Sequence, residues 1–361
     1  MALSPAVPSL RLHFFSSVRF LCGVCLSLSL RCCCHDSLLD GADTTTRRHN
    51  TMLAVVATHV VAPGAEVRRA GKVRRASSRR VVPARASGGS VASPLGRVLV
   101  LGGTGFVGSR ICLELLKAGY LVTSISRRGT PPSSDDGDAT AASGNRAARL
   151  RASVDWRVGD ASEPETARDV LREGGYVGVV HAVGMLLASD LNALASGSGS
   201  IPDADATYDR VTRVTACNAA DAAVQCVSID AAAGGVDADP PPPPFVFVSA
   251  AEARWDFAAP FDWLEEYLVA KRAVESRLTT LNEENKLRAS WLRPSLVYTF
   301  EKPAALPAVF AFVLGNAVGI PFVDRPVTVD TLARAAVRAL SDGETRGCLD
   351  YEAMERLANL P

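Results

Sequence analysis

The stretch Val98–Gly108 reads VLVLGGTGFVG and decides the fold. Its first four residues form a short apolar run, which is typical of a buried strand. Gly102, Gly105 and Gly108 then follow at intervals of three, and apolar residues recur at helical spacing over Val107–Leu115. A glycine-rich turn between a strand and a helix presents backbone N–H groups to an anion at the helix N-terminus. We therefore predict a phosphate-binding turn here; the alternative is a purely structural glycine turn.

Each glycine of this turn has a predicted role. Gly102 permits the tight change of direction, Gly105 lets the backbone approach a pyrophosphate, and Gly108 lets the helix pack closely on the strand. A pyrophosphate at such a turn is typical of a bound dinucleotide. The predicted cradle also includes Thr104, Phe106 and Val107.

The rest of the body alternates short apolar runs with helical periodicity, which predicts an α/β fold with a doubly wound parallel sheet. This domain covers 96–361 and ends in a small C-terminal α/β extension. Strands are expected at Val98–Leu101, Tyr120–Ile125, Val154–Val158, Val177–His181, Phe245–Ser249 and Ala289–Leu292, and later helices near Glu163–Glu173, Tyr208–Gln225, Trp263–Leu281 and Thr331–Leu340.

Three low-complexity inserts interrupt this frame, near 130–148, 189–206 and 229–244. They are rich in small and polar residues, glycine and proline, and such segments cannot build a core of their own. We expect surface loops at all three.

Residues 1–95 are predicted to be a disordered organelle transit leader. They hold 13 Lys and Arg against 4 Asp and Glu, although the whole chain has 39 and 38. An arginine-rich, acid-poor tract is typical of such leaders, and Val82–Ser90 resembles a plastid processing site. The chloroplast is the favoured address and the mitochondrion the alternative. A basic tail without an address, a secretory signal and a later start at Met52 stay open.

The remaining residues are acidic by about eight charges, which argues against binding nucleic acid through a basic surface. No transmembrane span is predicted, because the apolar run Leu21–Leu30 is too short to cross a bilayer. The cysteines of the body are widely separated, so neither a disulfide framework nor a metal site is expected.

Two arginines mark the end of the second predicted strand. The sequence there is Ser124-Ile125-Ser126-Arg127-Arg128, with no acid to accept a hydrogen bond from a ribose 2′-hydroxyl. A guanidinium suits a 2′-phosphate instead. NADP(H) is therefore the favoured cofactor and NAD(H) remains possible; the alternative is a pair of solvated loop arginines.

Tyr267 and Lys271 stand four residues apart in a predicted helix, so their side chains share one face. An ammonium beside a phenol lowers the pKa of the phenol, which would let Tyr267 exchange a proton with a carbonyl or alcohol. This pair is the predicted catalytic centre.

These motifs together resemble the extended and atypical short-chain dehydrogenase/reductase family, from about Gly96 to Leu357. The branch that is most similar contains the nucleotide-binding accessory subunit of respiratory complex I, a short-chain dehydrogenase-like protein of fungal ubiquinone synthesis, and plastid lipid-droplet proteins. The turn at Gly102–Gly108, the segment Ser124–Gly129, the Tyr267–Lys271 pair and Arg293–Tyr298 carry the resemblance.

The resemblance implies further site residues. Asp160 matches the family's adenine-contacting acid, and the segment with His181, Ala182 and Val183 matches the one that lines the cofactor ribose. Arg293 and Pro294 match a turn beside the nicotinamide, and Lys271 would hold the nicotinamide ribose.

Two of the matched residues have a second interpretation. His181 is expected to be a packed strand-end residue more than a base. Ser249 is the candidate for the family's third catalytic residue, but the usual position falls on Ala250 or Ala251. A packing role for Ser249 is the alternative.

The resemblance implies an organelle location and a link to prenylquinone or membrane redox systems. Two functional hypotheses follow: an NADPH-dependent oxidoreductase acting on a small-molecule or prenyl-lipid substrate, or a non-catalytic NADP(H)-binding accessory protein of a membrane-associated complex. A plastid RNA-binding relative of the fold is a third alternative, which the acidic body disfavours.

The leader yields a direct test. A fluorescent protein fused behind residues 1–95, or behind 52–95, is expected to enter the plastid and to be cleaved near Ala86, because the tract is rich in arginine and poor in acids. Microscopy and the size of the mature fusion check this, and cytosolic fluorescence from both fusions would contradict it.

Overall fold

The protein is described here from a computed structural model, which covers residues 94–130, 141–185, 206–234, 241–301, 306–318 and 324–360. Its centre is a seven-stranded sheet in which every neighbouring pair is parallel. The strand order is β3-β2-β1-β4-β5-β6-β9. The strands are β1 (Arg97–Leu101), β2 (Leu121–Ser126), β3 (Val154–Val158), β4 (Tyr176–His181), β5 (Pro244–Val248), β6 (Arg288–Leu292) and β9 (Gly347–Leu349).

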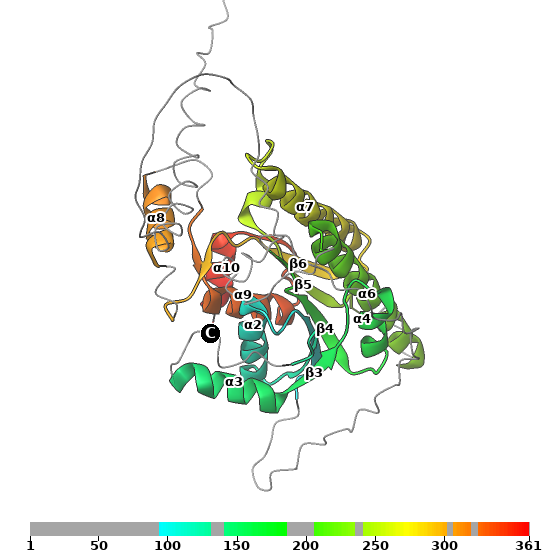
Figure 1. Ribbon diagram of the computed structural model, residues 1–361. Helices are drawn as coiled ribbons and strands as arrows, with labels where there is room; N and C mark the ends of the chain where they lie inside the picture. Colours follow the sequence, from blue (N-terminus) through cyan, green and yellow to red (C-terminus); the bar gives the residue numbers. More distant parts are fainter. Residues whose placement is uncertain are drawn as a thin grey trace, which may run out of the picture. The chain divides into compact units, whose positions relative to one another are not determined.

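Helices cover both faces of this sheet (Figure 1). One layer contains α2 (Phe106–Lys117), α9 (Val329–Ser341) and α10 (Tyr351–Ala358), with α3 (Ala141–Ser153) packed beside α2; the other contains α4 (Pro164–Leu171), α6 (Thr215–Gly234) and α7 (Asp262–Glu283). Each layer closes its own apolar core against the sheet. The predicted doubly wound parallel sheet is therefore confirmed.

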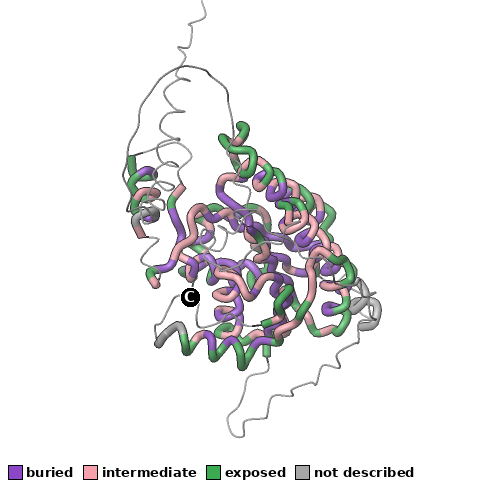
Figure 2. Tube along the Cα trace, in the orientation of Figure 1, coloured by how far each residue is buried: buried purple, intermediate pink, exposed green. Residues whose placement is uncertain are grey.

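The central strands are buried along most of their length, as Figure 2 shows in purple. Val98, Leu99, Val100 and Leu101 have no exposed surface, because a parallel sheet with helices on both faces leaves neither side of a strand to solvent. This explains why β1 reads as a continuous apolar run and not as an alternation.

The strand order reverses between β1 and β4, which are neighbours in the sheet. At such a point the two following connections leave toward opposite faces, so a crevice opens outside the carboxyl ends of the strands. The turn after β1 and the segment after β4 therefore line the same crevice.

The expectation that the inserts are loops is wrong in part. Residues 141–148 belong to α3, and residues 229–234 belong to α6, which continues to Gly234. Pro244, taken as the end of the third insert, is the first residue of β5. Residues 131–140, 189–205 and 235–240 of these inserts lie outside the described part of the chain.

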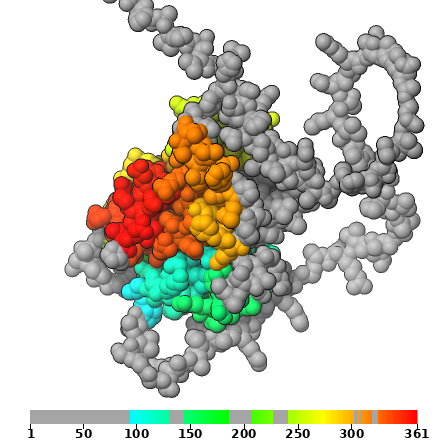
Figure 3. Space-filling model, turned by 90° about the vertical axis from the view of Figure 1, so that its left-hand side faces the viewer, coloured from blue at the N-terminus to red at the C-terminus, as the bar shows by residue number. Residues whose placement is uncertain are grey.

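Smaller elements complete the domain. A π-helical segment, η1 (Asp209–Val214), leads into α6, and a short 3-10 helix, η2 (Ala251–Arg254), follows β5. β7 (Val297–Tyr298) pairs with β8 (Val327–Thr328), and α8 (Leu306–Ala317) lies between them in the chain. Figure 3 shows the orange region that includes α8 at the molecular surface. Among the described helices, none is long and apolar enough to cross a membrane.

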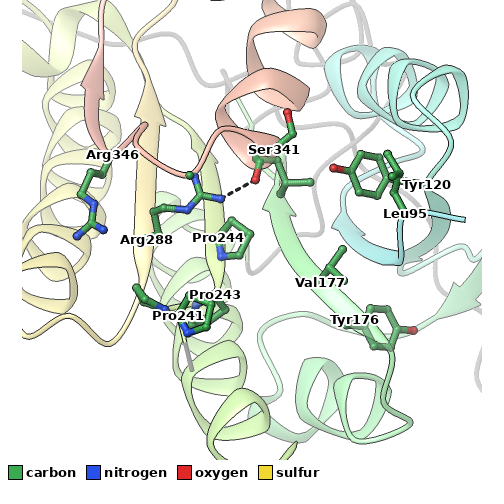
Figure 4. A pocket seen from close by; sticks show the side chains of 13 residues that line it. Leu95, Tyr120, Tyr176, Val177, Pro241, Pro243, Pro244, Arg288, Ser341 and Arg346 are labelled. Carbon is green, nitrogen blue, oxygen red and sulfur yellow. Dashed lines mark hydrogen bonds between the residues drawn. The ribbon is translucent and has the colours of Figure 1, made fainter. Parts of the chain in front are cut away.

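A groove of about 580 Å³ lies at the amino ends of the strands (Figure 4). Tyr120, Tyr176, Pro244 and Arg288 line it where β2, β4, β5 and β6 begin. The buried Arg288 guanidinium donates to the carbonyls of Ala339 (2.9 Å) and Leu340 (2.6 Å) and so caps the end of α9. Because ligands of open α/β sheets bind at the carboxyl ends of the strands, this groove is not the candidate site.

Candidate functional site

The turn after β1 has the backbone that its glycines predict. Gly102 has a φ of +84°, a conformation that residues with a Cβ rarely adopt. A Cβ on Gly108 would stand 2.2 Å from the carbonyl oxygen of Gly102, so only glycine lets α2 start this close to the turn. The turn is therefore held by backbone sterics rather than by side chains.

Gly105 is less tightly enclosed than Gly102 and Gly108, the other two glycines spaced at intervals of three. A Cβ on Gly105 would meet only the Gly102 oxygen, at 3.3 Å, a tight contact but much less severe than the 2.2 Å at Gly108. Gly105 is the N-cap of α2; no side chain caps this end, and no acidic residue lies in the first turn. Phe106 and Val107 open the helix, and Thr104 lies partly buried in the turn. An electropositive helix start without a side-chain cap or an acidic residue fits a pyrophosphate.

The segment after β4 closes against this turn. Ala182 donates its N–H to Leu101 at 2.9 Å, and a Cβ on Gly102 would meet the Ala182 oxygen at 2.8 Å and the Val183 nitrogen at 2.9 Å. The two predicted cofactor segments therefore face each other across the crevice between β1 and β4.

His181 is fully buried at the end of β4. Its Nε2 lies 2.8 Å from Thr215 Oγ1, and that hydroxyl donates to the Val211 carbonyl at 2.7 Å, so the imidazole donates to the threonine. Burial and the nearby Lys271 ammonium lower the pKa of His181 to about 3. The side chain is therefore neutral and packed, and it ties β4 to the start of α6.

A basic cluster lies beyond the end of β2. Arg127 and Arg128 are exposed there, and Asp160 follows β3 with Ser162 N–H donating to it at 2.9 Å. Arg210 of η1 donates to Asp160 at 3.4 Å and to Ser162 Oγ at 3.3 Å. Burial alone would raise the pKa of Asp160, but the hydrogen bonds of Ser162 and the charges of Arg210 and Arg127 hold it below its ordinary value.

Lys271 of α7 lies where this helix meets the segments after β4 and β5. Its ammonium is buried, donates to the Val248 carbonyl at 2.7 Å, and lies 4.8 Å from the centre of the Phe247 ring. It stands 5.5 Å from the centre of the Tyr267 ring, and a Cβ on Gly184 would come within 3.8 Å of it. Burial lowers the pKa of Lys271 to about 8, although Glu275 opposes the shift.

Tyr267 lies partly buried on the same face of α7, in edge contact with Tyr208 at a centroid distance of 5.9 Å. Burial raises the pKa of its phenol, and the charge of Glu252 and the neighbouring Tyr208 add to the rise. The phenol is therefore protonated, and the expectation that Lys271 lowers its pKa is wrong, because burial raises it instead. To act as a base, this phenol would need a further positive charge beside it.

Ser249 is buried at the end of β5 and donates to Glu275 Oε1 at 2.5 Å. Arg293, after β6, holds the same carboxylate through both oxygens, at 3.0 and 2.5 Å. Pro294 accepts from the Ala251 N–H at 2.9 Å. The structure thus places Ser249, Arg293 and Pro294 in one network that joins β5, β6 and α7, and the serine hydroxyl is already committed to a carboxylate.

Sequence motifs do not indicate three polar residues at this edge. Two of them, Glu275 and Arg210, are the partners described above. The third is Glu252 of η2: burial and Asp324 raise its pKa, and its charge raises the pKa of Tyr267. No sequence motif identifies Glu252, because a single glutamate after a strand forms no recognisable pattern. Asn218, which resembles the family's structural asparagine, donates to the Ser162 carbonyl at 2.9 Å.

The arrangement fits a dinucleotide along the carboxyl edge of the sheet. The anionic part would lie at the turn after β1, the adenosine end toward Asp160 and the arginines, and the reactive end toward Lys271 and Tyr267. Within the described residues, no cluster of three His, Cys, Asp or Glu side chains could hold a metal ion.

Comparison with known proteins agrees with this geometry. Residues 98–312 match the model of the NAD dependent epimerase/dehydratase family. The chain belongs to this family. The matched range of this epimerase/dehydratase member starts in β1 and includes the phosphate turn, the Tyr267–Lys271 pair and the turn after β6. Binding of a nicotinamide dinucleotide therefore follows from the family as well as from the site.

Individual relatives are more distant. The MIOREX complex component 2 of Saccharomyces cerevisiae is 32% identical over 94 residues, which span 26% of this chain and 30% of the yeast protein. A short-chain type dehydrogenase/reductase from Mycobacterium ulcerans is 17% identical over 73% of this chain and 91% of its own, with a TM-score of 0.48. An oxidoreductase from Burkholderia thailandensis is 17% identical over 73% of this chain and 93% of its own, with a TM-score of 0.49.

The buried lysine makes stability depend on pH. Its pKa falls from 10.5 to about 8 on folding, so between these values the unfolded chain binds more protons than the folded one, and wild-type stability rises with pH. Lys271→Met removes this dependence. We expect the unfolding free energy of the variant, relative to wild type, to fall by about 3 kcal/mol between pH 7 and pH 10.

Urea unfolding at the two pH values measures this change. Lys286→Met, at an exposed lysine, is the matched control and is expected to keep a constant difference from wild type. Parallel pH dependence of wild type and Lys271→Met would show that the ammonium is not buried in the folded protein.

Proposed function

We propose that this epimerase/dehydratase-family protein is an NADPH-dependent oxidoreductase of an organelle, acting on a carbonyl or quinone-like prenyl-lipid substrate. The observation that carries the proposal is the position of Lys271. Its ammonium lies 5.5 Å from the centre of the Tyr267 ring and close to the backbone at Gly184. One cation therefore lies near both the proposed proton donor, Tyr267, and the segment after β4 that is predicted to line the cofactor.

The residues of the chain divide the chemistry among them. The dinucleotide, when bound, supplies or accepts the hydride. The Tyr267 phenol, kept protonated by burial, is suited to give its proton to a carbonyl oxygen as that oxygen gains negative charge. The Lys271 cation, 5.5 Å from the centre of the Tyr267 ring, would balance the charge of the phenolate that remains.

The preference for NADP(H) is supported by charge. Arg127 and Arg128 are exposed after β2, where an NAD-specific site places an acid. Arg210 and Arg127 both act on the charge of Asp160, so the adenosine end of the crevice is rich in guanidinium groups. Such groups bind a 2′-phosphate with charge-assisted hydrogen bonds.

The location is proposed from the leader. The arginine-rich, acid-poor composition of residues 1–95 supports import into a plastid, with the mitochondrion as alternative. The relative in yeast is named as a component of the MIOREX complex, which supports association of this chain with a larger assembly.

A non-catalytic accessory role is the second candidate, and one observation favours it. The Ser249 hydroxyl is bound to Glu275, so it is not available to donate to a substrate oxygen. Loss of one such donor typically removes about 3–4 kcal/mol of transition-state stabilisation. An assembly protein that keeps NADP(H) as a structural ligand would not need that donor. Binding of RNA is the third and weakest candidate, because the body of the chain is acidic.

Cofactor choice is tested by calorimetry on the chain from Ser87 onward. Arg127→Ala is expected to weaken NADPH binding about 10- to 100-fold and to leave NADH binding nearly unchanged, because only NADPH carries the 2′-phosphate. Arg172→Ala, at an exposed arginine paired with acids on α4, is the control. Equal affinities of the wild type for NADPH and NADH would exclude the proposed preference.

Catalysis is separated from binding by two substitutions in a strain that lacks the protein. Tyr267→Phe removes one oxygen and is expected to bind NADPH normally but to fail to restore function. Gly105→Val places a branched side chain beside the phosphate turn and is expected to abolish binding and function. Gly105→Ala, whose Cβ would stand 3.3 Å from the Gly102 oxygen, is the smaller matched change, and the melting temperatures of both variants check that the fold is kept. Full rescue by Tyr267→Phe together with failure of Gly105→Val would replace the enzyme proposal by the accessory one.

A further inference from the structure

Helix α8 presents an apolar stripe to the outside of the molecule. Phe310, Val313, Leu314 and Ala317 stand at positions i, i+3, i+4 and i+7, which places them on one helix face. The first three side chains are 68%, 45% and 51% exposed, and Ala317 is exposed as well. Three large apolar side chains on one exposed stripe mark a surface that meets something apolar.

An ordinary surface helix turns its apolar side chains inward, whereas α8 exposes large apolar side chains to solvent. Gly315, on the opposite side of the helix, is buried, and so is Val309 at the border of the stripe, so the stripe is the outward face. The sequence of α8, LPAVFAFVLGNA, has no charged residue, and Asn316 is its only polar one. A helix that is apolar all round is normally buried on every side. Among the described residues, none covers the outward face of α8.

The exposed surface continues along the chain on both sides of α8. Phe300, before the helix, is 70% exposed, and Val318, directly after it, is 65% exposed. Phe300 packs edge-on against Tyr298 at a centroid distance of 5.3 Å, which holds its ring in place. The orange surface in Figure 3 includes this part of the chain.

The segment that carries α8 is anchored on both sides at the carboxyl edge of the sheet. Before the helix, Glu301 pairs with Arg110 of α2 and, at 2.6 Å, with Arg146 of α3. After the helix, Asp324 pairs with Arg254 of η2 at 2.8 Å. Since α2 begins at the phosphate turn and η2 carries Glu252, the outward face of α8 is held on the side of the molecule that holds the candidate site.

The dimensions of the stripe distinguish among a membrane span, a protein partner and a lipid surface. Twelve residues of helix are about 18 Å long, too short for the ~30 Å core of a bilayer. A stripe about 10 Å wide then has an area of roughly 180 Å², far below the ~800 Å² per partner of a stable protein interface. A second copy of the chain is not held by this face alone. A lipid surface has no such threshold, because each side chain inserts on its own.

We propose that α8 is a lipid-surface anchor that lies in the plane of a membrane interface, with Phe310, Val313 and Leu314 inserted among the acyl chains. The body of the chain is acidic by about eight charges, so attraction to anionic headgroups does not drive the contact. Binding is instead apolar, it occurs on zwitterionic lipid, and it is insensitive to salt. The anchor stands whether the chain is a catalyst or an accessory protein, because it rests on none of the site residues.

The test uses the full chain with phosphatidylcholine vesicles in about 0.5 M salt, which screens the basic leader. Wild type is expected to sediment with the vesicles. Phe310→Asp and Leu314→Asp are each expected to weaken binding about tenfold or more, and Leu360→Asp, at an exposed apolar residue near the C-terminus, is expected to bind like wild type. All three variants change exposed positions, so their melting temperatures should match that of wild type.

A second variant reports insertion directly. The fluorescence of Leu314→Trp is expected to shift to the blue with vesicles and to be quenched by brominated acyl chains. Equal binding of wild type and Phe310→Asp, or binding that needs anionic lipid and disappears with salt, would overturn the proposal and assign the contact to the leader. A wild-type dimer that becomes monomeric in Phe310→Asp without lipid would overturn it in favour of an interface between copies.

Discussion

The candidate site depends on the hydrogen bonds that the Glu275 carboxylate accepts from Ser249 and Arg293. This carboxylate is buried on α7, accepts the Ser249 hydroxyl at 2.5 Å, and holds Arg293 through both of its oxygens. These bonds fix the ends of β5 and β6 to the helix that carries Tyr267 and Lys271. A buried carboxylate and guanidinium stabilise a structure only as a pair, because either one alone is an uncompensated charge. The same carboxylate opposes the loss of the Lys271 proton.

The protonation of the site follows from burial more than from pairing. Burial raises the pKa of Tyr267 and lowers the pKa of both Lys271 and His181, and in each case it is the largest cause. All three shifts favour the neutral form of the group. A neutral phenol can give a proton but cannot take one, so the described state suits the reductive direction of the proposed reaction. The oxidative direction would need the phenol to ionise against the charge of Glu252.

Local signals explain which parts of the fold could be predicted from the sequence. The strand, turn and helix over Val98–Gly108 are encoded by neighbouring residues, and the structure has them in place. α3 was not foreseen, because residues 141–153 are rich in Ala, Arg and Ser and have no apolar stripe; packing on α2 accounts for the helix there. Propensity is a weak signal that tertiary contacts override.

The same reasoning applies to the site. The spacing of Tyr267 and Lys271 on one helix turn was readable, because the two residues are four positions apart. The pairing of Ser249 with Glu275 joins residues 26 positions apart, and that of Asp160 with Arg210 joins residues 50 apart. Such contacts depend on how β5 lies against α7 and how η1 lies against the loop after β3. A single sequence carries no pattern for them.

The two edges of the sheet differ in how well their buried polar groups are satisfied. At the amino edge the Arg288 guanidinium donates to the Ala339 and Leu340 carbonyls at the end of α9 and to the Thr345 carbonyl beyond it. At the carboxyl edge, Ser124 Oγ beneath Gly103 and Asp324 Oδ2 beside η2 have no hydrogen-bond partner among the described residues. Each such atom costs about 1–3 kcal/mol of stability. Buried polar atoms without a hydrogen-bond partner are concentrated at functional sites, because a polar group that is already bonded to the protein is not free to bind a ligand. The segment that carries α8 is attached to this edge through Asp324 and Glu301, so the exposed apolar face of α8 belongs to the same side of the domain as the candidate site.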